Sequence, residues 1–352
     1  MANLALLGDD GEVADHGGVR VRAELVGWVT GERSVNRTDL RWAVDGTDLG
    51  VLWSSGRDTV LAAFGDTFQP RNPAGGGRGG DRRSNVLARS TDRDLSRGMI
   101  IESFVTDRDG HAAEILPARK VNGWEKSIIP TAGIHVDGRD HLAYMSVRRW
   151  GAPGWWRTNY AGFAYSDDGG RTWAKPIGRG GPTWWNTWRG DQRFQMVALA
   201  GHGDHVLIFG TPNGREGSCY LARARLDHLL QPGRHEQWCA DGWRAGNPPV
   251  DQWHTVPLFG PWVSELSVAW HRPTQRWLAT YFDQGRGAIV VRSAPEPTGP
   301  WSEQHEVATS AEWPGLYGAY LHPWSMDDPE PLFLMSQWGP YAVAAMRLTD
   351  LC

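Results

Sequence analysis

Residues 45–68 read DGTDLGVLWSSGRDTVLAAFGDTF, and this stretch predicts a β-hairpin. Two short apolar strands, Leu49–Ser54 and Thr59–Phe64, flank a Ser-Gly-Arg-Asp sequence of the kind that forms tight turns between antiparallel strands. Each strand has one aspartate at the end away from the turn, Asp48 on the first and Asp66 on the second. The hairpin therefore predicts a local fold and a pair of carboxylates at its open end.

The two aspartates are expected to be near cross-strand partners. Asp48 is nine residues before Arg57, at the centre of the turn, and Asp66 is nine residues after it. Such partners lie about 4.5 to 5.5 Å apart at Cβ, and like charges there destabilise a sheet. Two carboxylates about 5 Å apart are what a glycosidase uses, one to protonate the leaving oxygen and one to attack or to activate water. Alternatively, both aspartates only cap turns beside Gly50 and Gly65, and the spacing leaves both interpretations open.

The composition limits the classes of partner. The chain has 352 residues and a formal net charge of -4, whereas nucleic-acid binding usually depends on a basic surface. No apolar run approaches the roughly 18 residues that a membrane span needs, and the start, MANLALLGDDGE, lacks the basic-then-apolar pattern of a signal peptide. We expect a monomer with a neutral substrate, no nucleic-acid partner and no membrane partner.

Tryptophan is the outlying residue type, with 21 Trp against 8 Tyr and 9 Phe. It clusters at Trp155 and Trp156 and again at Trp184, Trp185 and Trp188. Indole rings are large, rigid and amphipathic, and they stack well on the apolar faces of sugar rings. The competing interpretation, large core residues wedged between packed sheets, covers more than half of the tryptophans.

The cysteines and histidines show no metal-ligand spacing, so neither a metal nor a cofactor is predicted. Of the three cysteines, Cys219 and Cys239 could pair as a disulfide, and Cys352 is expected to be a free terminal thiol. The histidines near predicted strands are expected to be structural: His135, His141, His205 and His322.

The hairpin is the first copy of a unit that occurs five times. Each copy has an apolar strand, a tight turn, a second apolar strand, a long variable loop and a third strand. Their first strands begin at Asp48, Ala132, Gln195, Glu265 and Tyr317, their second strands at Thr59, His141, His205, Arg276 and Pro331, and their third strands at Asn85, Gly162, Cys219, Ala288 and Tyr341. Radial repetition of small antiparallel sheets is a β-propeller. We predict an all-β fold, a five-bladed β-propeller formed by residues 1–352 as a single domain, with residues 1–18 as a flexible N-terminal segment.

Two further stretches fit this architecture. The fifth copy ends at Leu348 with almost no chain left for an outer strand, so VRVRAELVG from Val19 is expected to supply that strand and close the ring. The second copy continues as SDDGGRTW, Ser166 to Trp173, which resembles the Asp-box of sialidase-like propellers, a turn between a blade's third and fourth strands. Asp168 is therefore interpreted as a turn residue on the face opposite the usual active site.

In a propeller the first strand of each blade lines the axis, so first-strand starts and second-strand ends meet at one mouth. Asp48 and Asp66 rank first among the carboxylates there, as the catalytic pair, because one hairpin contains both. Glu125 and Glu265 come second, as hydroxyl-binding groups or as groups that shift the pKa of the pair; alternatively, each pairs with a neighbouring arginine. The residues expected to bind substrate are Glu125, Thr131, Arg148, Glu265, Asp283, Tyr317 and Trp338.

The stretch RNPAGGGRGGDRR, residues 71–83, is interpreted as a mobile loop at the rim of this mouth. Its glycines superficially resemble a phosphate-binding loop. It lacks the Gly-Lys-Ser/Thr ending and a following helix, so a phosphate site is not predicted.

Five motifs in a fixed order also resemble a known family: GTDLG at Gly46, FGDTF at Phe64, IIPTAGI at Ile128, SELSVAW at Ser264 and SQWGPY at Ser336. Together they resemble the actinobacterial endo-D-arabinanases, a glycoside hydrolase family long catalogued as a domain of unknown function. The resemblance implies a five-bladed propeller that cleaves internal α-D-arabinofuranosyl linkages in mycobacterial arabinogalactan and lipoarabinomannan, with Asp48 and Asp66 as catalytic residues. It implies a cell-wall polysaccharide, D-arabinan, as partner and an extracellular site of action, reached by a route not visible in the sequence or by phage delivery.

The mechanism expected of such a pair has one aspartate protonating the leaving oxygen while the other attacks C1 or activates water. The like charges raise one pKa and keep that group protonated, and cross-strand proximity leans towards retention of configuration. The two roles are not assigned by the sequence. Two rivals remain: a sialidase-like hydrolase, although the chain lacks an Arg-Ile-Pro motif, and a non-catalytic carbohydrate-binding propeller in which the aspartates only bind hydroxyls.

Overall fold

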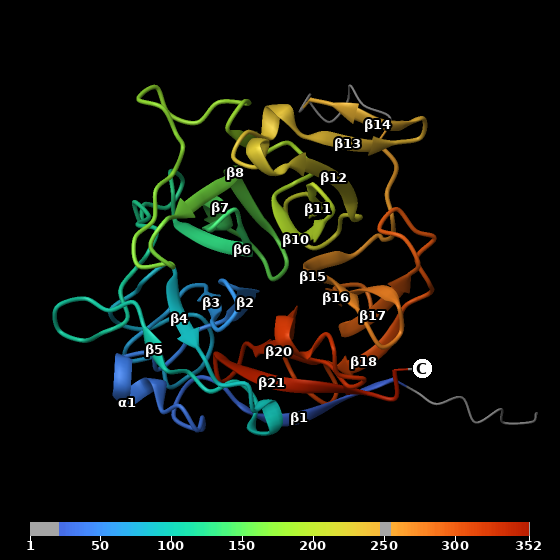
Figure 1. The fold of residues 1–352 in the computed structure, drawn as a ribbon. Coiled ribbons are helices and arrows are strands. Elements are labelled where there is room, and N and C mark those ends of the chain that lie inside the picture. Colours follow the sequence, from blue (N-terminus) through green and yellow to red (C-terminus); the bar gives the residue numbers. More distant parts are fainter. Residues whose placement is uncertain (1–20, 247–254, 352) are drawn as a thin grey trace, which may run out of the picture.

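The computed structural model describes residues 21–246 and 255–351, which form five antiparallel sheets of four or five strands. The sheets stand in a ring around a central axis, and successive sheets along the chain are neighbours in the ring (Figure 1). The prediction of an all-β fold is confirmed. The expectations for residues 1–18 and for Cys352 fall outside the described residues.

Each of the first four sheets is a meander whose strands follow one another in sequence. The first contains β2 (Leu49–Ser54), β3 (Val60–Phe64), β4 (Val86–Ser90) and β5 (Ser103–Phe104). The second contains β6 (Ser127–Val136), β7 (Arg139–Trp150), β8 (Trp156–Ser166) and β9 (Thr187–Arg189). The third contains β10 (Met196–His202), β11 (His205–Thr211), β12 (Tyr220–Arg225), β13 (Glu236–Cys239) and β14 (Gly242–Ala245). The fourth contains β15 (Val263–His271), β16 (Arg276–Asp283), β17 (Ala288–Ala294) and β18 (His305–Thr309).

The fifth sheet joins the two ends of the described chain. Its strands are β19 (Leu316–Leu321), β20 (Leu332–Gln337), β21 (Ala342–Thr349) and β1 (Arg22–Trp28), with β1 outermost. β1 pairs antiparallel with β21, from Arg22 opposite Thr349 to Trp28 opposite Ala344. The expected closure of the ring by an N-terminal strand is confirmed.

Helical structure is sparse. The elements are α1 (Thr38–Trp42) and the 3-10 turns η1 (Leu95–Arg97), η2 (Leu226–His228), η3 (Pro232–Arg234) and η5 (Pro323–Ser325). No helix in the described part of the chain is long and apolar enough to cross a membrane.

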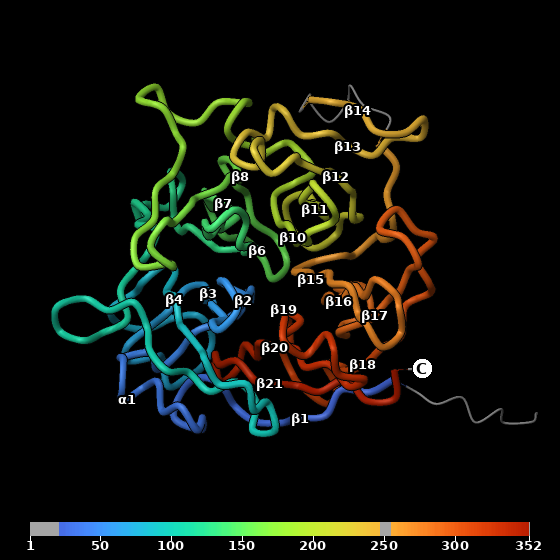
Figure 2. Tube along the Cα trace, in the orientation of Figure 1, coloured from blue at the N-terminus to red at the C-terminus, as the bar shows by residue number. Residues whose placement is uncertain are grey.

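The first strand of every sheet faces the axis. β2, β6, β10, β15 and β19 contact one another in that cyclic order (Figure 2). Between them lies an axial cavity of about 330 Å³, lined by residues such as Val51, Thr131, Leu266 and Tyr320. The starts of the first strands and the ends of the second strands therefore meet at one end of the axis, as the repeat predicted.

Most strands are apolar on both sides because neighbouring sheets cover both of their faces. All five residues of β3 are buried, and so are all six of β19. A short continuous apolar run is the pattern expected for a fully buried strand, and it explains why the repeat could be recognised in the sequence.

The start of the second sheet differs from the prediction, which placed it at Ala132. β6 begins at Ser127 and includes Pro130, beside which the register with β7 shifts at a β-bulge. Proline has no N–H for the ladder and is tolerated in strands at such bulges. The strand therefore begins five residues earlier than predicted and continues through the bulge towards the mouth.

The turn around Asp168 has the contacts of a structural turn. Its carboxylate accepts hydrogen bonds from the Thr172 N–H at 2.9 Å, the Thr172 hydroxyl at 2.7 Å and the Ser166 hydroxyl at 2.8 Å. A Cβ on Gly170 would lie 2.8 Å from Leu87, so the turn packs tightly on the first sheet. Ser166 ends β8 opposite Asp140, at the start of β7, so the turn lies at the end of the sheet away from the mouth.

The cysteine pairing left open by the sequence does not form. Cys219 and Cys239 are both buried free thiols.

A buried carboxylate joins the first sheet to the second. Asp140, 1% exposed, accepts hydrogen bonds from Trp53 Nε1 at 3.0 Å and the Ser55 hydroxyl at 2.8 Å, and His135 Nδ1 lies 3.0 Å from it. Buried polar groups cost stability unless they are paired, so this contact holds β2 against the second sheet.

We predict that Asp140→Ala lowers the free energy of unfolding by about 2 to 4 kcal/mol, because the buried donors on Trp53 and Ser55 lose their acceptor. Asp167→Ala is the matched control, since Asp167 is 60% exposed and only pairs with Arg139 on the surface. Asp167→Ala should lower the free energy of unfolding by about 0 to 1 kcal/mol. Denaturant titration measures both, and equal losses would contradict the role given to Asp140.

Candidate active site

The open end of the first hairpin places Asp48 against Gly65. The register pairs Leu49 with Phe64, and the Gly65 N–H donates to the Asp48 carbonyl at 3.0 Å. A bulge at Gly50 (φ 91) shifts the register by one residue, so Asp48 stands opposite Gly65 and not, as predicted, opposite Asp66. A Cβ on Gly65 would lie 2.4 Å from Asp48 Oδ1, so only glycine leaves room for this carboxylate.

The surroundings of Asp48 favour the neutral form of its carboxyl group. Burial and then the charge of Asp66 raise its pKa from 3.8 to about 7, and the hydroxyls of Tyr317 and Tyr341 oppose that rise. Oδ2 accepts a hydrogen bond from the Tyr317 hydroxyl at 2.8 Å. Oδ1 is buried and has no hydrogen-bond partner among residues 21–246 and 255–351. A proton on Oδ1 would therefore disturb no existing hydrogen bond.

Asp66 lies in a contrasting, cationic environment. Its Oδ1 accepts hydrogen bonds from Arg82 Nη2 at 2.9 Å and from the Ser127 hydroxyl at 2.7 Å. Burial raises the pKa of Asp66, while Arg82, Ser127 and Lys126 act in the opposite direction. Asp66 thus has an arginine and a hydroxyl that stabilise its ionised form, whereas Asp48 has hydroxyls alone.

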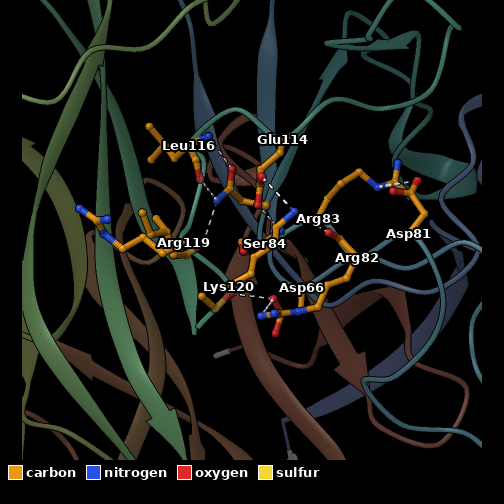
Figure 3. A network of polar contacts seen from close by, with 12 residues as sticks. Asp66, Asp81, Arg82, Arg83, Ser84, Glu114, Leu116, Arg119 and Lys120 are labelled. Carbon is orange, nitrogen blue, oxygen red and sulfur yellow. Dashed lines mark hydrogen bonds and ion pairs between the residues drawn. The ribbon is translucent and has the colours of Figure 1, made fainter. Parts of the chain in front are cut away.

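A polar network fixes Arg82, as Figure 3 shows. Arg82 Nη2, which binds Asp66, also donates to the Lys126 carbonyl at 2.9 Å. Lys120 Nζ donates to the Arg82 carbonyl at 2.8 Å and lies 3.2 Å from Glu114 Oε2. Glu114 Oε1 in turn accepts from the Ser84 N–H at 2.8 Å. These contacts hold the loop at residues 71–83 so that its Arg82 side chain reaches Asp66.

A second ion pair lies on the Asp48 side of the mouth. Arg215 donates to Glu265 Oε1 through Nη2 at 2.6 Å and Nε at 3.2 Å. The Arg215 guanidinium also lies 5.2 Å from the ring centre of Tyr317, whose hydroxyl binds Asp48. Glu265 Oε2 is buried and lacks a hydrogen-bond partner in the described part of the chain. Of the two alternatives left by the sequence, the structure shows the pairing with an arginine, and binding of a substrate hydroxyl by Glu265 remains a prediction.

Two of the predicted substrate-binding residues lie beside the second sheet. Glu125 accepts hydrogen bonds from the Arg119 N–H at 3.1 Å and the Ser146 hydroxyl at 2.8 Å. Arg148 donates from Nε to the Gly123 carbonyl at 2.9 Å. Both side chains thus hold the segment that precedes β6.

The remaining predicted residues are more scattered. Thr131 lines the axial cavity. Asp283 closes the β16–β17 turn, where its Oδ1 accepts the Arg286 N–H at 3.0 Å. Trp338 is 52% exposed at the mouth and covers Gly76. The structure therefore gathers Asp48, Asp66, Glu265 and Tyr317 closely, and it spreads the other residues around them.

Four residues of the site were missed by the sequence analysis: Arg82, Ser127, Arg215 and Tyr341. Tyr341 belongs to the SQWGPY motif and Arg82 to the arginine-rich loop, so both lay within stretches already noted. Ser127 precedes the proline that obscured the start of β6. Arg215 follows β11 in a loop that had no distinguishing pattern.

Within the described residues, no group of three or more His, Cys, Asp or Glu side chains is arranged to hold a metal ion. The mouth presents the Asp48 carboxyl, the ion pairs Arg82–Asp66 and Arg215–Glu265, and several hydroxyls.

Solved structures share this fold. A Bacteroides ovatus protein provisionally described as a hydrolase aligns with 89% of this chain and 88% of its own, with a TM-score of 0.60 and 12% sequence identity. The catalytic domain of the GH62 α-L-arabinofuranosidase from Coprinopsis cinerea aligns with 95% of this chain and 98% of its own, with a TM-score of 0.53 and 12% identity. The fold thus belongs to a class of all-β, propeller-type architectures that includes glycoside hydrolases.

Residues 33–347 match one family model, and the chain belongs to that family, Domain of unknown function (DUF4185). Notoamide biosynthesis cluster protein J from Aspergillus sp. (strain MF297-2) is 30% identical over 318 residues, which are 85% of this chain and 81% of the fungal protein. The predicted membership of a family catalogued as a domain of unknown function is confirmed. Endo-D-arabinanase activity, the other part of the resemblance, remains a prediction.

We predict that Asp48→Asn stabilises the protein at neutral pH. Because the pKa of Asp48 is raised from 3.8 to about 7, the unfolded chain releases this proton first, and stability falls as the pH rises from about 4 to 7. The unfolding free energy of the wild type falls by up to about 4 kcal/mol over this range. The asparagine side chain of the variant does not ionise, so the variant avoids this fall.

The measurement is the unfolding free energy of both proteins at pH 4, 6 and 8. The difference should be small at pH 4 and grow with pH. Asp58→Asn is the control, because the Asp58 side chain is 89% exposed in the turn of the same hairpin. This variant should keep the wild-type pH dependence. A pH-independent difference for Asp48→Asn would contradict the raised pKa.

Proposed function

We propose that the protein is an endo-acting glycoside hydrolase that cleaves internal α-D-arabinofuranosyl linkages of mycobacterial arabinogalactan and lipoarabinomannan. The observation behind this proposal is the unequal carboxyl pair, in which Asp48 has a pKa of about 7 beside Asp66, which is bound by Arg82 and Ser127. A carboxyl that is protonated near neutral pH beside one bound by a cation is an arrangement suited to acid-assisted glycoside cleavage.

The environments of the two groups support different roles for them in this proposal. Asp48 is the general acid, because it keeps a proton near neutral pH and can transfer it to the leaving glycosidic oxygen as the bond from C1 to that oxygen breaks. Asp66 is the nucleophile or base, because Arg82 and Ser127 stabilise its negative charge. It either attacks C1, to be displaced later by water, or takes a proton from the water that attacks C1. Glu265 and Tyr317 would then bind hydroxyls and tune the pKa of Asp48.

The substrate class is supported by three features. The chain has the motifs that resemble endo-D-arabinanases, and its fold is also that of a GH62 α-L-arabinofuranosidase. Exposed tryptophans at the mouth, such as Trp338 and Trp262, offer flat apolar surfaces for sugar rings. We further propose that the five sheets are the blades of a five-bladed propeller, that Ser166–Trp173 is its Asp-box and that the enzyme acts outside the cell.

A sialidase-like activity fits the mouth less well. Such an enzyme needs arginines that are free to bind the substrate carboxylate. Both arginines beside the candidate pair are already bound to protein carboxylates, Arg82 to Asp66 and Arg215 to Glu265.

The exposed tryptophans also support a second candidate function, that of a carbohydrate-binding propeller without catalysis. In that case Asp48 and Asp66 would only bind hydroxyls. Binding of polysaccharide without release of products would support this candidate.

The proposed function predicts that the purified protein releases a ladder of short oligosaccharides from mycobacterial arabinogalactan. Asp66→Asn should lower turnover at least about a hundredfold on every substrate, because it removes the nucleophile or base. Asp48→Asn should lower turnover of the polymer by about the same factor. It should lower turnover far less on an arabino-oligosaccharide with a nitrophenyl leaving group, because that group departs without a proton.

Size separation of the polymer products and release of nitrophenol are the two readouts. Similar losses for both variants on the nitrophenyl substrate would contradict the assignment of roles. Near-normal turnover of the polymer by both variants would contradict the site itself. The anomer formed first distinguishes attack by Asp66 on C1 from activation of water.

A pH profile tests the acid separately. If Asp48 must be protonated, kcat/KM falls above about pH 7, where that proton is lost. The Tyr317 hydroxyl stabilises the ionised form of Asp48, so Tyr317→Phe raises this pKa and should move the alkaline limb upward by about one pH unit. Tyr165→Phe, at the opposite end of the second sheet, is the control and should leave the limb in place. A downward move in Tyr317→Phe would contradict the role of Asp48 as acid.

A further inference from the structure

A large hollow opens beside the second sheet. Its volume is about 840 Å³, compared with about 330 Å³ for the axial cavity. It lies between the segment that precedes β6, the start of β8 and the segment that leads to β9. Its lining includes Arg119, Trp124, Glu125, Tyr160, Lys175 and Trp184.

The hollow adjoins the candidate catalytic pair. Glu125 lines it, and Ser127, two residues further along, donates its hydroxyl hydrogen bond to Asp66. Two residues of extended chain span about 7 Å at most. Ser146 joins the two regions again, because its hydroxyl binds Glu125 and it pairs with Ile128 in the β6–β7 ladder. A polymer bound at Asp66 therefore has the hollow within reach of its neighbouring residues.

The walls of the hollow combine flat aromatic rings with fixed polar groups. Trp124 is 59% exposed and Trp184 is 45% exposed, although large apolar side chains are usually covered. Asn159 Nδ2 donates to the Trp124 carbonyl at 2.6 Å and to the Ser146 hydroxyl at 3.1 Å, which fixes the backbone at Trp124. Rings with an apolar face beside a few placed polar groups are the usual construction of a sugar-binding surface.

Two of the three cations that line the hollow have a carboxylate close by. Lys175 interacts with the charge of Glu125, and Arg189 pairs with Asp191 at 3.1 Å. The third, Arg119, lies 4.3 Å from the ring centre of Trp124 and leaves an excess of one positive charge. The flat rings are therefore the main feature offered to a ligand, and they suit a neutral sugar.

We propose that this hollow is an accessory subsite that binds neutral sugar residues of the same polysaccharide, on one side of the bond being cleaved. The inference rests on the proposed function, because it takes the neighbouring mouth to be the place of cleavage. The subsite holds the chain away from its ends, which favours long substrates and internal cleavage over removal of terminal residues.

The test measures binding, so it does not depend on turnover. Full-length Asp66→Asn protein is run in native gels that contain D-arabinan or, for comparison, L-arabinan, xylan or galactan. Trp124→Ala and Trp184→Ala are each added to this background. Trp124→Phe and Trp184→Phe are the matched controls, because they keep an aromatic face.

The affinity for D-arabinan, measured from the retardation, should fall about fivefold or more in each alanine variant. It should change little in the phenylalanine variants. In otherwise wild-type protein the same alanine variants should raise KM for the polymer severalfold while kcat stays within twofold. Unchanged retardation, or equal weakening in the alanine and phenylalanine variants, would overturn the subsite.

The outcome is distinguishable from failure of the proposed function. If the wild type releases nothing from D-arabinan but another polymer retards the protein in a Trp124-dependent way, the subsite stands and the assigned substrate is wrong. If D-arabinan is cleaved and the alanine variants bind it normally, the function stands and the subsite is wrong.

Discussion

The pairing of β1 with β21 is the constraint on which the mouth depends, because it closes the ring of sheets. Every sheet supplies part of the site. Asp48 comes from the first sheet, Ser127 from the second, Glu265 from the fourth and Tyr317 from the fifth, while Arg215 follows a strand of the third. The hydrogen bond from Tyr317 to Asp48 joins the fifth sheet to the first, so an open arc of sheets would lose this contact. Closure of the ring therefore holds Asp48 against the hydroxyl that binds it.

Within the closed ring, two carboxyls from one hairpin acquire different properties from their surroundings. Asp48 packs on Gly65 and accepts a hydrogen bond from the Tyr317 hydroxyl, whereas Asp66 accepts hydrogen bonds from an arginine and a hydroxyl. Because desolvation penalises a charge and a nearby cation compensates for it, the first carboxyl stays neutral more readily than the second. The loop at residues 71–83 contributes to this difference, since further contacts outside the hairpin, with Lys120 and the Lys126 carbonyl, help to hold Arg82 beside Asp66. Figure 3 shows the contact with Lys120.

The sequence predicted the ring, its closing strand and the aspartate pair because these depend on local patterns: apolar runs, turn residues and their repetition. It could not predict the one-residue register shift at Gly50, which depends on positive φ values at both Leu49 (φ 68) and Gly50 (φ 91). Nor could it predict that Arg82 and Arg215 bind carboxylates from distant strands, because such pairing is a property of the assembled ring. Pro130 led to a β6 that was too short, since the bulge that accommodates proline has no simple sequence signal.

The closing pair of strands also sets the order in which the molecule can be completed during synthesis. Arg22 pairs with Thr349, more than three hundred residues further along the chain. The first four sheets are made of consecutive segments and can form as each emerges from the ribosome, whereas the fifth must wait for β21. Loop closure over such a separation is entropically costly, and the nascent chain remains an unclosed arc until β21 has been made. Tyr317 and the strands of the fifth sheet follow the first four sheets, and the mouth is therefore incomplete until β21 can pair with β1.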